Sequence, residues 1–138
     1  MALPEFCNGT LPPGIHRAFE EEILSRFCST TPERQRLAPP LKELTYIAQD
    51  ASAMALYLNG SFVTDKAGPR DIDAVIELPL QFDPNGPVVD RLRTLHRDYG
   101  LDIEHVGAHD AEYRDQLLNE FFGTDRAGRK RGTVEVIV

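Results

Sequence analysis

The sequence predicts an α/β (α+β) fold in which a small mixed β-sheet is flanked by helices. Short apolar runs that stop at glycine or proline, as strands do, alternate with longer segments whose apolar residues recur every three or four positions, as in helices. The chain has 138 residues, which is the length of one domain. We therefore expect a single domain over residues 1–138, with N-terminal helices in 15–53 and the sheet in 54–138.

Composition excludes several classes of protein. Hydrophobic residues make up 41% of the chain and charged residues 27%, which favours a packed core over disorder. We find neither a secretory leader pattern nor a run of about 18 apolar residues, so we expect a cytoplasmic protein without a membrane partner. Cys7 and Cys28 lack the spacing of a zinc site. The net charge of −7 disfavours broad adhesion to nucleic acid.

The first part of the chain carries helical signals. Apolar residues at helical spacing, following a Pro-Pro-Gly turn, predict a helix over 15–27. Thr31, as an N-cap before Pro32, predicts a second helix start. The consecutive prolines 39 and 40 remove two amide donors, so we expect a break there and a further helical segment over 41–53.

The second part alternates strand and helix patterns. Apolar and β-branched runs mark the strands, and amphipathic spacing marks the helices between them. In order, we expect a strand over 54–59, a strand over 72–78, a helix over 88–99 ending at Gly100, a strand over 101–106, a helix over 111–122 and a strand over 133–138.

Two aspartates stand one residue apart where the second strand begins. Side chains alternate along a strand, so Asp71 and Asp73 point to one face and Ile72 and Ala74 to the other. The two carboxylates then lie roughly 6 to 7 Å apart and repel each other. A divalent cation would relieve that repulsion, because Mg²⁺ is typically bound through one or two carboxylates plus substrate phosphates.

A glycine-serine turn precedes the aspartates and supplies the chemistry for a phosphate. Gly60 allows the backbone to approach a ligand closely, and a helical turn after it would direct amide hydrogens and the Ser61 hydroxyl at an anion. Lys66 adds a positive charge for a phosphate oxygen. These three residues are our candidate nucleotide-binding residues.

The Gly-Ser turn, nine intervening residues and the Asp-x-Asp pair between two predicted strands together resemble the signature of the DNA polymerase beta-like nucleotidyltransferases. In that superfamily two aspartates bind catalytic Mg²⁺ or Mn²⁺, and a third carboxylate comes from a neighbouring strand. The resemblance implies a palm-type fold and makes Asp71, Asp73 and Asp102 the candidate catalytic and metal-binding residues. Glu104 shares the face of Asp102 and is the alternative third ligand.

The wider sequence resembles a group of small bacterial and phage-borne proteins allied to the minimal nucleotidyltransferases. This implies transfer of a nucleotidyl group from a nucleoside triphosphate to a protein or RNA hydroxyl, in a toxin–antitoxin or phage-defence setting. A toxin or antitoxin partner, or a homo-oligomer, is then expected. The alternative is an inactive binding module of the same fold, because Thr64, Asp65 and Lys66 stand where many minimal members carry an arginine.

A basic run near the C-terminus contrasts with the acidic chain. It contains Arg126, Arg129, Lys130 and Arg131. A solvated hairpin explains such a run, and a local phosphate or RNA contact is the alternative. His105 alternates with Asp102 and Glu104, so we interpret it as structural.

Overall fold

The computed structural model describes residues 3–107, 110–118 and 130–138. It confirms an α/β fold, with five strands in the order β1-β5-β2-β3-β4. The pairs β1/β5 and β3/β4 are parallel, whereas β2 is antiparallel to both β3 and β5, so the sheet is mixed. The strands are β1 Gly14–Ala18, β2 Ala55–Asn59, β3 Asp73–Leu78, β4 Asp102–Gly107 and β5 Gly132–Val136.

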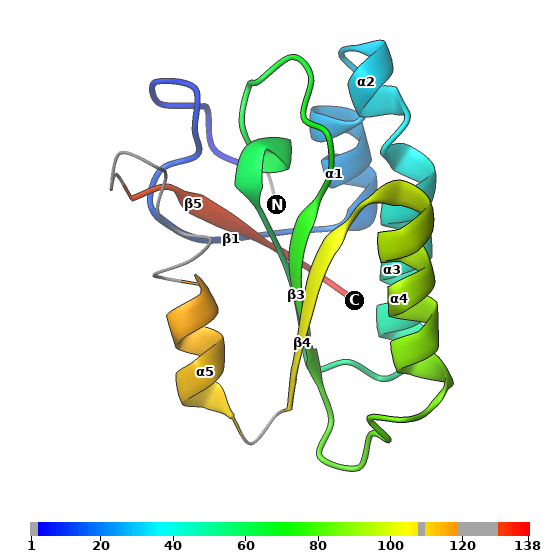
Figure 1. Cartoon of the computed structure of the whole chain (residues 1–138). Coiled ribbons are helices and arrows are strands. Elements are labelled where there is room, and N and C mark those ends of the chain that lie inside the picture. Colours follow the sequence, from blue (N-terminus) through cyan, green and yellow to red (C-terminus); the bar gives the residue numbers. More distant parts are fainter. Residues whose placement is uncertain (1–2, 108–109, 119–129) are drawn as a thin grey trace.

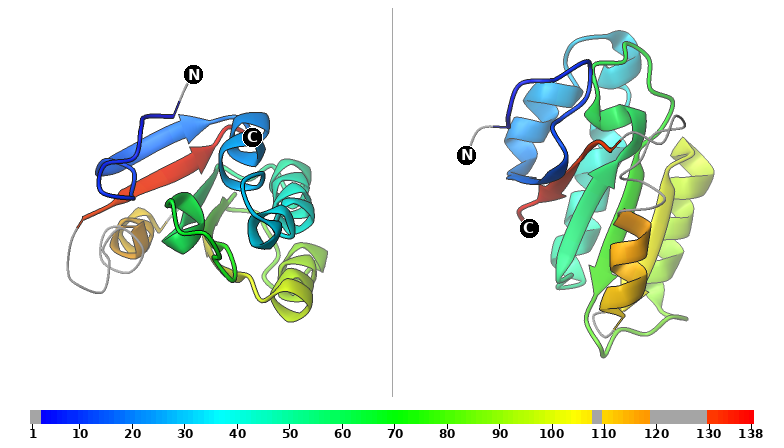
Figure 2. Two further views of the ribbon diagram at one scale, coloured as in Figure 1. Left: turned by 90° about the horizontal axis from the view of Figure 1, so that it is seen from above. Right: turned by 90° about the vertical axis from the view of Figure 1, so that its left-hand side faces the viewer.

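Helices cover both faces of the sheet. Figures 1 and 2 show α1, α3 and α4 on one face and α5 on the opposite face. The helices are α1 Glu20–Phe27, α2 Pro32–Gln35, α3 Ala38–Asp50, α4 Pro87–Tyr99 and α5 Ala111–Gln116, and a 3₁₀ turn, η1, spans Gly60–Val63.

Each face of the sheet has its own apolar cluster, because side chains alternate along the strands. The larger cluster joins α1, α3 and α4 to the sheet and includes Leu58, Ala74 and Ile76. The smaller one joins Tyr57 and Val75 to the residues that follow α5. The expected strands over 54–59, 72–78, 101–106 and 133–138 are confirmed to within two residues at each end, the largest difference being at the C-terminus, where β5 ends at Val136.

The helix predicted over 15–27 is wrong in its first part. Residues 14–18 form β1, which pairs with β5, and the helix begins only at Glu20. Ile15 and Phe19, on which the helical pattern depended, are each 52% exposed, whereas Ile23 and Phe27 are fully buried. This segment therefore forms a strand because it can pair with β5. That backbone pairing outweighs the helical spacing of its apolar residues.

The two consecutive prolines begin a helix instead of breaking one. Helix α3 starts at Ala38, so Pro39 and Pro40 occupy its first turn. Amides of the first turn have no partner within the helix, and their absence costs nothing there. The segment predicted over 41–53 thus lies at 38–50.

The remaining helix signals are largely confirmed. The Thr31 side chain accepts a hydrogen bond from the Arg34 amide at 3.2 Å and caps α2. Helix α4 ends at Gly100, which adopts the left-handed conformation with a φ of 74°. Of the helix predicted over 111–122, α5 covers the first part, and residues 119–122 lie outside the described residues. Arg126 and Arg129 also lie outside them.

None of the helices in the described ranges is both long and apolar enough to cross a membrane.

Candidate functional site

The aspartates of the Asp-x-Asp pair lie beside a third aspartate at one end of the sheet. Asp73 and Asp102 are register partners at the first positions of the parallel strands β3 and β4, so their side chains share a face. Asp71 lies two residues before Asp73, and both are partly exposed, whereas Ile72 between them is fully buried. The predicted alternation is therefore confirmed, and Figure 1 shows where β3 and β4 begin side by side.

The charges of these carboxylates act on one another. Burial, together with the nearby charges of Asp71 and Asp102, raises the pKa of Asp73 to about 6. Burial and the Asp102 charge also raise the pKa of Asp71, while Lys66 and Arg70 lower it. The three groups are close enough to repel, and protonation or a cation would relieve the repulsion.

The Gly-Ser turn lies directly against Asp73. Asn59, the last residue of β2, is the register partner of Asp73, and the chain then turns into η1 at Gly60. Gly60 has a φ of 76°, and a Cβ there would lie 2.9 Å from Cγ of Asp73 and closer still to its Oδ2. Only glycine fits this backbone against the carboxylate. Ser61 follows in η1 and is partly exposed.

A buried arginine, which the sequence analysis missed, holds the segment after this turn. Arg34 is only 2% exposed. Its guanidinium donates hydrogen bonds to the carbonyl oxygens of Phe27, Ser61, Phe62, Thr64 and Lys66, at distances from 2.6 to 3.3 Å. The side chain therefore fixes the path of residues 61–66. No motif marks it, because its partners are backbone carbonyls remote in sequence.

A hydrogen-bonded pair of polar side chains, Thr133 and Asn59, lies next to Asp73 in the sheet. Thr133 Oγ1 donates to Asn59 Oδ1 at 2.6 Å, and Asn59 is fully buried. Among the described residues, Nδ2 of Asn59 has no hydrogen-bond acceptor. Buried amides are normally paired, so a strand residue of this kind next to Asp73 marks a specialised position. An asparagine directly before Gly60 was the sequence signal that could have identified it.

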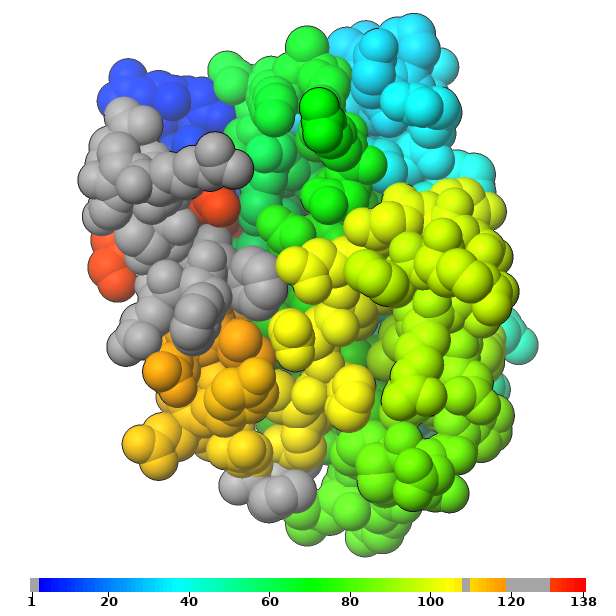
Figure 3. Space-filling model, in the orientation of Figure 1, coloured from blue at the N-terminus to red at the C-terminus, as the bar shows by residue number. Residues whose placement is uncertain are grey.

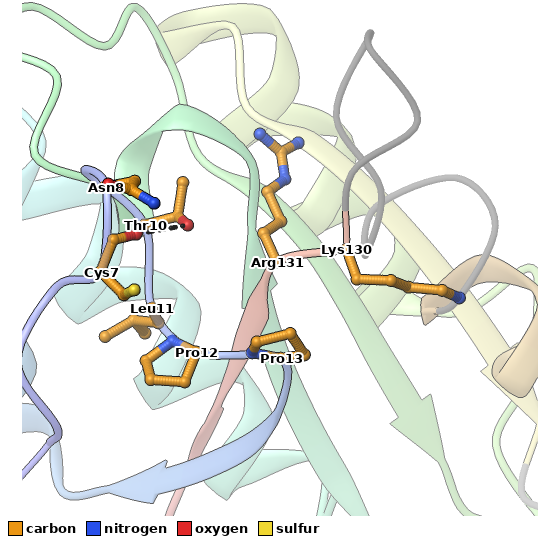
Figure 4. Close-up of a pocket in the computed structure, with 8 residues that line it drawn as sticks. All are labelled: Cys7, Asn8, Thr10, Leu11, Pro12, Pro13, Lys130 and Arg131. Atoms are coloured by element: carbon orange, nitrogen blue, oxygen red, sulfur yellow. Dashed lines mark hydrogen bonds between the residues drawn. The ribbon is translucent and has the colours of Figure 1, made fainter.

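The cationic groups of the site come from two directions. Lys66 is exposed, and its charge lowers the pKa of Asp71, so it lies on the Asp71 side. Arg131, at the start of β5, lowers the pKa of Asp73. Figure 4 shows Arg131 and Lys130 above the loop 7–13, where they line a pocket of about 290 Å³. In the sequence Arg131 belongs to the basic run that ends before β5, and only the fold brings its charge to Asp73.

The donor set suits a hard cation that retains outside ligands. Among the described residues, no group of three or more carboxylate, imidazole or thiol side chains is arranged to hold a metal ion alone. Asp71, Asp73 and Asp102 nevertheless form one negative region, and Mg²⁺ usually keeps waters and substrate phosphates as ligands. The residues therefore fit Mg²⁺ bound together with a phosphate-bearing substrate, and their assignment as metal ligands stays a prediction.

The alternative ligand and the nearby histidine lie farther from the centre of the site. Glu104 shares the face of Asp102 but pairs with Val75, two residues further along the strands. His105 alternates with both acidic residues, and its ring packs edge-on against Phe82 with a centroid distance of 5.8 Å. This supports a structural role for His105.

Comparison with known proteins identifies the family of this chain. The model of a family described as "Family of unknown function (DUF6932)" matches residues 4–137. No curated protein and no solved structure matches the chain.

Proposed function

We propose that this chain, which belongs to the DUF6932 family of unknown function, is a metal-dependent nucleotidyltransferase with a polymerase beta-like palm fold. One observation carries the proposal: Asp73 lies between the Gly60 turn and its register partner Asp102, with Asp71 two residues away. The Gly-Ser turn and the three aspartates thus lie together at one end of the sheet, which supports a role for the turn in phosphate binding.

Asp71 and Asp73 would hold the metal ions, with Mn²⁺ as a substitute for Mg²⁺. When bound there with a nucleoside triphosphate, the ions would supply positive charge that neutralises the phosphoryl oxygens. Gly60, Ser61 and Lys66 would seat the phosphates, and the charge of Arg131, which lowers the pKa of Asp73, reaches the same region.

The reaction is a substitution at the α-phosphorus. An acceptor hydroxyl oxygen forms a bond to that phosphorus, the bond to the β-phosphate oxygen breaks, and pyrophosphate leaves with the electron pair. Asp102 is the exposed member of the three carboxylates, so it can take the hydroxyl proton and release it to water. The toxin–antitoxin or phage-defence setting rests on the resemblance alone, and the cytoplasmic location stays a prediction from the sequence.

Transfer is tested with each α-labelled nucleoside triphosphate, Mg²⁺ and cell lysate. Replacing Asp71 and Asp73 together by alanine should abolish labelling, while Asp90→Ala, an exposed aspartate in the first turn of α4, should leave it unchanged. Ser61→Ala should reduce it about fivefold to tenfold, because one hydrogen bond contributes on the order of 1 kcal/mol. Equal labelling by the double-alanine protein would overturn the proposal.

A binding module without turnover is the second candidate. It is favoured by the lack, among the described residues, of a ready set of three metal ligands. A parent protein that binds nucleotide or a partner protein, yet labels no lysate component with any triphosphate, would support this candidate.

A further inference from the structure

A further pocket, whose lining includes the residue before Asp71, is formed by side chains that have no role in the proposed reaction. It has a volume of about 460 Å³, within the range of small-ligand sites. Its lining includes Arg36 and Leu37 from the segment between α2 and α3, Pro39 from the first turn of α3, Arg70 directly before Asp71, and Tyr99 from the end of α4. In Figures 1 and 3, α2 lies above this end of α4.

The pocket adjoins the carboxylates through two short connections. Arg70 is the neighbour of Asp71, and its charge lowers the pKa of that carboxyl. Tyr99 is joined to Asp102 by the left-handed turn at Gly100. Two of its lining residues, Arg70 and Tyr99, are therefore one and three residues along the chain from Asp71 and Asp102, which do not themselves line the pocket.

The lining combines two cations with an aromatic ring. Neither Arg36 nor Arg70 is ion-paired within the part of the chain that the structure describes. The Tyr99 side chain is 47% exposed, and buried Leu37 forms part of the apolar wall. Single-stranded nucleic acids are bound by this combination, in which bases stack on aromatic rings and cations contact phosphates.

The acidic residues of the pocket lining could accept hydrogen bonds from a ribose or from the edge of a base. Asp98 and Glu33 also line the pocket, and Asp98 is held by Arg97 at 3.1 Å. Carboxylates accept hydrogen bonds from ribose hydroxyls and exocyclic amines. Because the chain carries a net charge of −7, a long polyanion would be repelled, and the contact is restricted to one or two nucleotides.

We propose that this pocket binds the terminal nucleotide of a single-stranded RNA and presents its hydroxyl to Asp71 and Asp102. The acceptor is then RNA and not protein. The statement about the acceptor depends on the proposed function, whereas binding of the RNA end does not.

Binding is measured by fluorescence anisotropy with a 5′-labelled RNA tetranucleotide, without metal or triphosphate. Replacing Arg36 and Arg70 together by methionine should weaken binding at least tenfold, and Tyr99→Leu should weaken it about fivefold or more. The matched control replaces Arg17 and Arg91, which do not line the pocket, by methionine and so makes the same change in charge. It should bind within twofold of the parent.

Salt dependence and competition give independent readouts. Two phosphate contacts on a single strand predict a slope of log K against log salt of about −1.4, and the double-methionine protein should show a slope near zero. Unlabelled tetranucleotide should compete much better than adenosine monophosphate. Equal competition would assign the pocket to a free nucleotide and overturn RNA as the ligand.

The outcomes separate this inference from the proposed function. Unchanged binding in the double-methionine protein, or no binding of RNA by the parent, overturns the inference even if nucleotide transfer occurs. RNA binding that depends on these residues, without any transfer, upholds the pocket and counts against the transferase. With transfer present, a tetranucleotide carrying a 3′-phosphate should bind and remain unlabelled.

Discussion

The Asp73 carboxyl group packs against the backbone of Gly60, so closely that a Cβ on Gly60 would lie 2.9 Å from Cγ of Asp73. The turn that is proposed to seat a phosphate and the carboxylate that is proposed to hold a cation are therefore a single packed unit. A change in either residue displaces the other.

Gly60→Ala should destabilise the protein more than Gly100→Ala, and the comparison isolates the contact with Asp73. The two glycines have similar φ angles, 76° and 74°, but nothing lies within 4 Å of a Cβ on Gly100. Gly100→Ala should cost about 1 kcal/mol from backbone strain, and Gly60→Ala should cost at least about 1 kcal/mol more. Urea denaturation measures both, and equal costs would mean that the Asp73 contact contributes nothing.

The raised pKa of Asp73 predicts a pH dependence of stability. The group ionises near its ordinary pKa of 3.8 in the unfolded chain and at about 6 in the folded protein. Between these values the folded state holds a proton that the unfolded state has lost, so the contribution of Asp73 to stability falls as the pH rises through this window. Asp73→Asn cannot ionise and should melt at a higher temperature than the parent at pH 7.5.

Melting curves at pH 5 and pH 7.5 check this prediction. The gain from Asp73→Asn should be smaller at pH 5, where the parent carboxyl is largely protonated. Asp90→Asn, at an exposed and distant site, is the matched control. A gain of the same size at both pH values would contradict the assigned pKa.

Mg²⁺ or Mn²⁺ should raise the melting temperature at pH 7.5, because a cation relieves the repulsion among Asp71, Asp73 and Asp102. At ten times the dissociation constant the gain is about 1.4 kcal/mol, or roughly 3 to 5 °C for a chain of this size. The gain should shrink at pH 5, since protons compete for Asp73.

The double-alanine variant of Asp71 and Asp73 should lose the metal effect, and Asp90→Ala should keep it. Removal of mutually repelling carboxylates should also leave the metal-free double variant at least as stable as the parent. An unchanged melting temperature of the parent at millimolar metal would count against a cation site at this edge of the sheet.

The parts of the fold that could be predicted are those encoded by local signals. Helix α4 has an amphipathic pattern and a terminal glycine, and the Asp71–Asp73 alternation follows from strand geometry alone. The proximity of Asp102 required only that β3 and β4 pair in parallel. Strand β1 could not be predicted, because it forms by pairing with β5, which comes from the far end of the chain.

The cations of the site were the least predictable part. Arg34 acts through backbone carbonyls of a loop distant in sequence, and Arg131 reaches Asp73 only because β5 lies beside β2. The ion pair between Glu77 and Arg114 at 3.1 Å, which joins α5 to β3, is likewise a tertiary contact without a sequence motif. The sequence pattern of a single helix or strand carries no information about such long-range contacts.

Arg34→Met should strongly destabilise the protein. It removes six hydrogen bonds from a buried guanidinium to carbonyls that include those of Ser61, Thr64 and Lys66. Hydrogen bonds from charged donors are strong, and buried carbonyls left without a donor are costly, so the loss should exceed about 3 kcal/mol. Arg34→Lys retains the charge and part of the bonding and should fall between Arg34→Met and the parent.

Hydrogen exchange locates the effect of this change. Because the guanidinium holds residues 61–66, their amides should exchange faster in Arg34→Lys than in the parent, while amides of α4 should keep their rates. Metal binding should weaken too, since this segment leads into Asp71. The matched control is Arg93→Met, whose side chain is 75% exposed and should change neither stability nor exchange. Unaltered exchange at 61–66 in Arg34→Lys would show that the segment holds its path without the guanidinium.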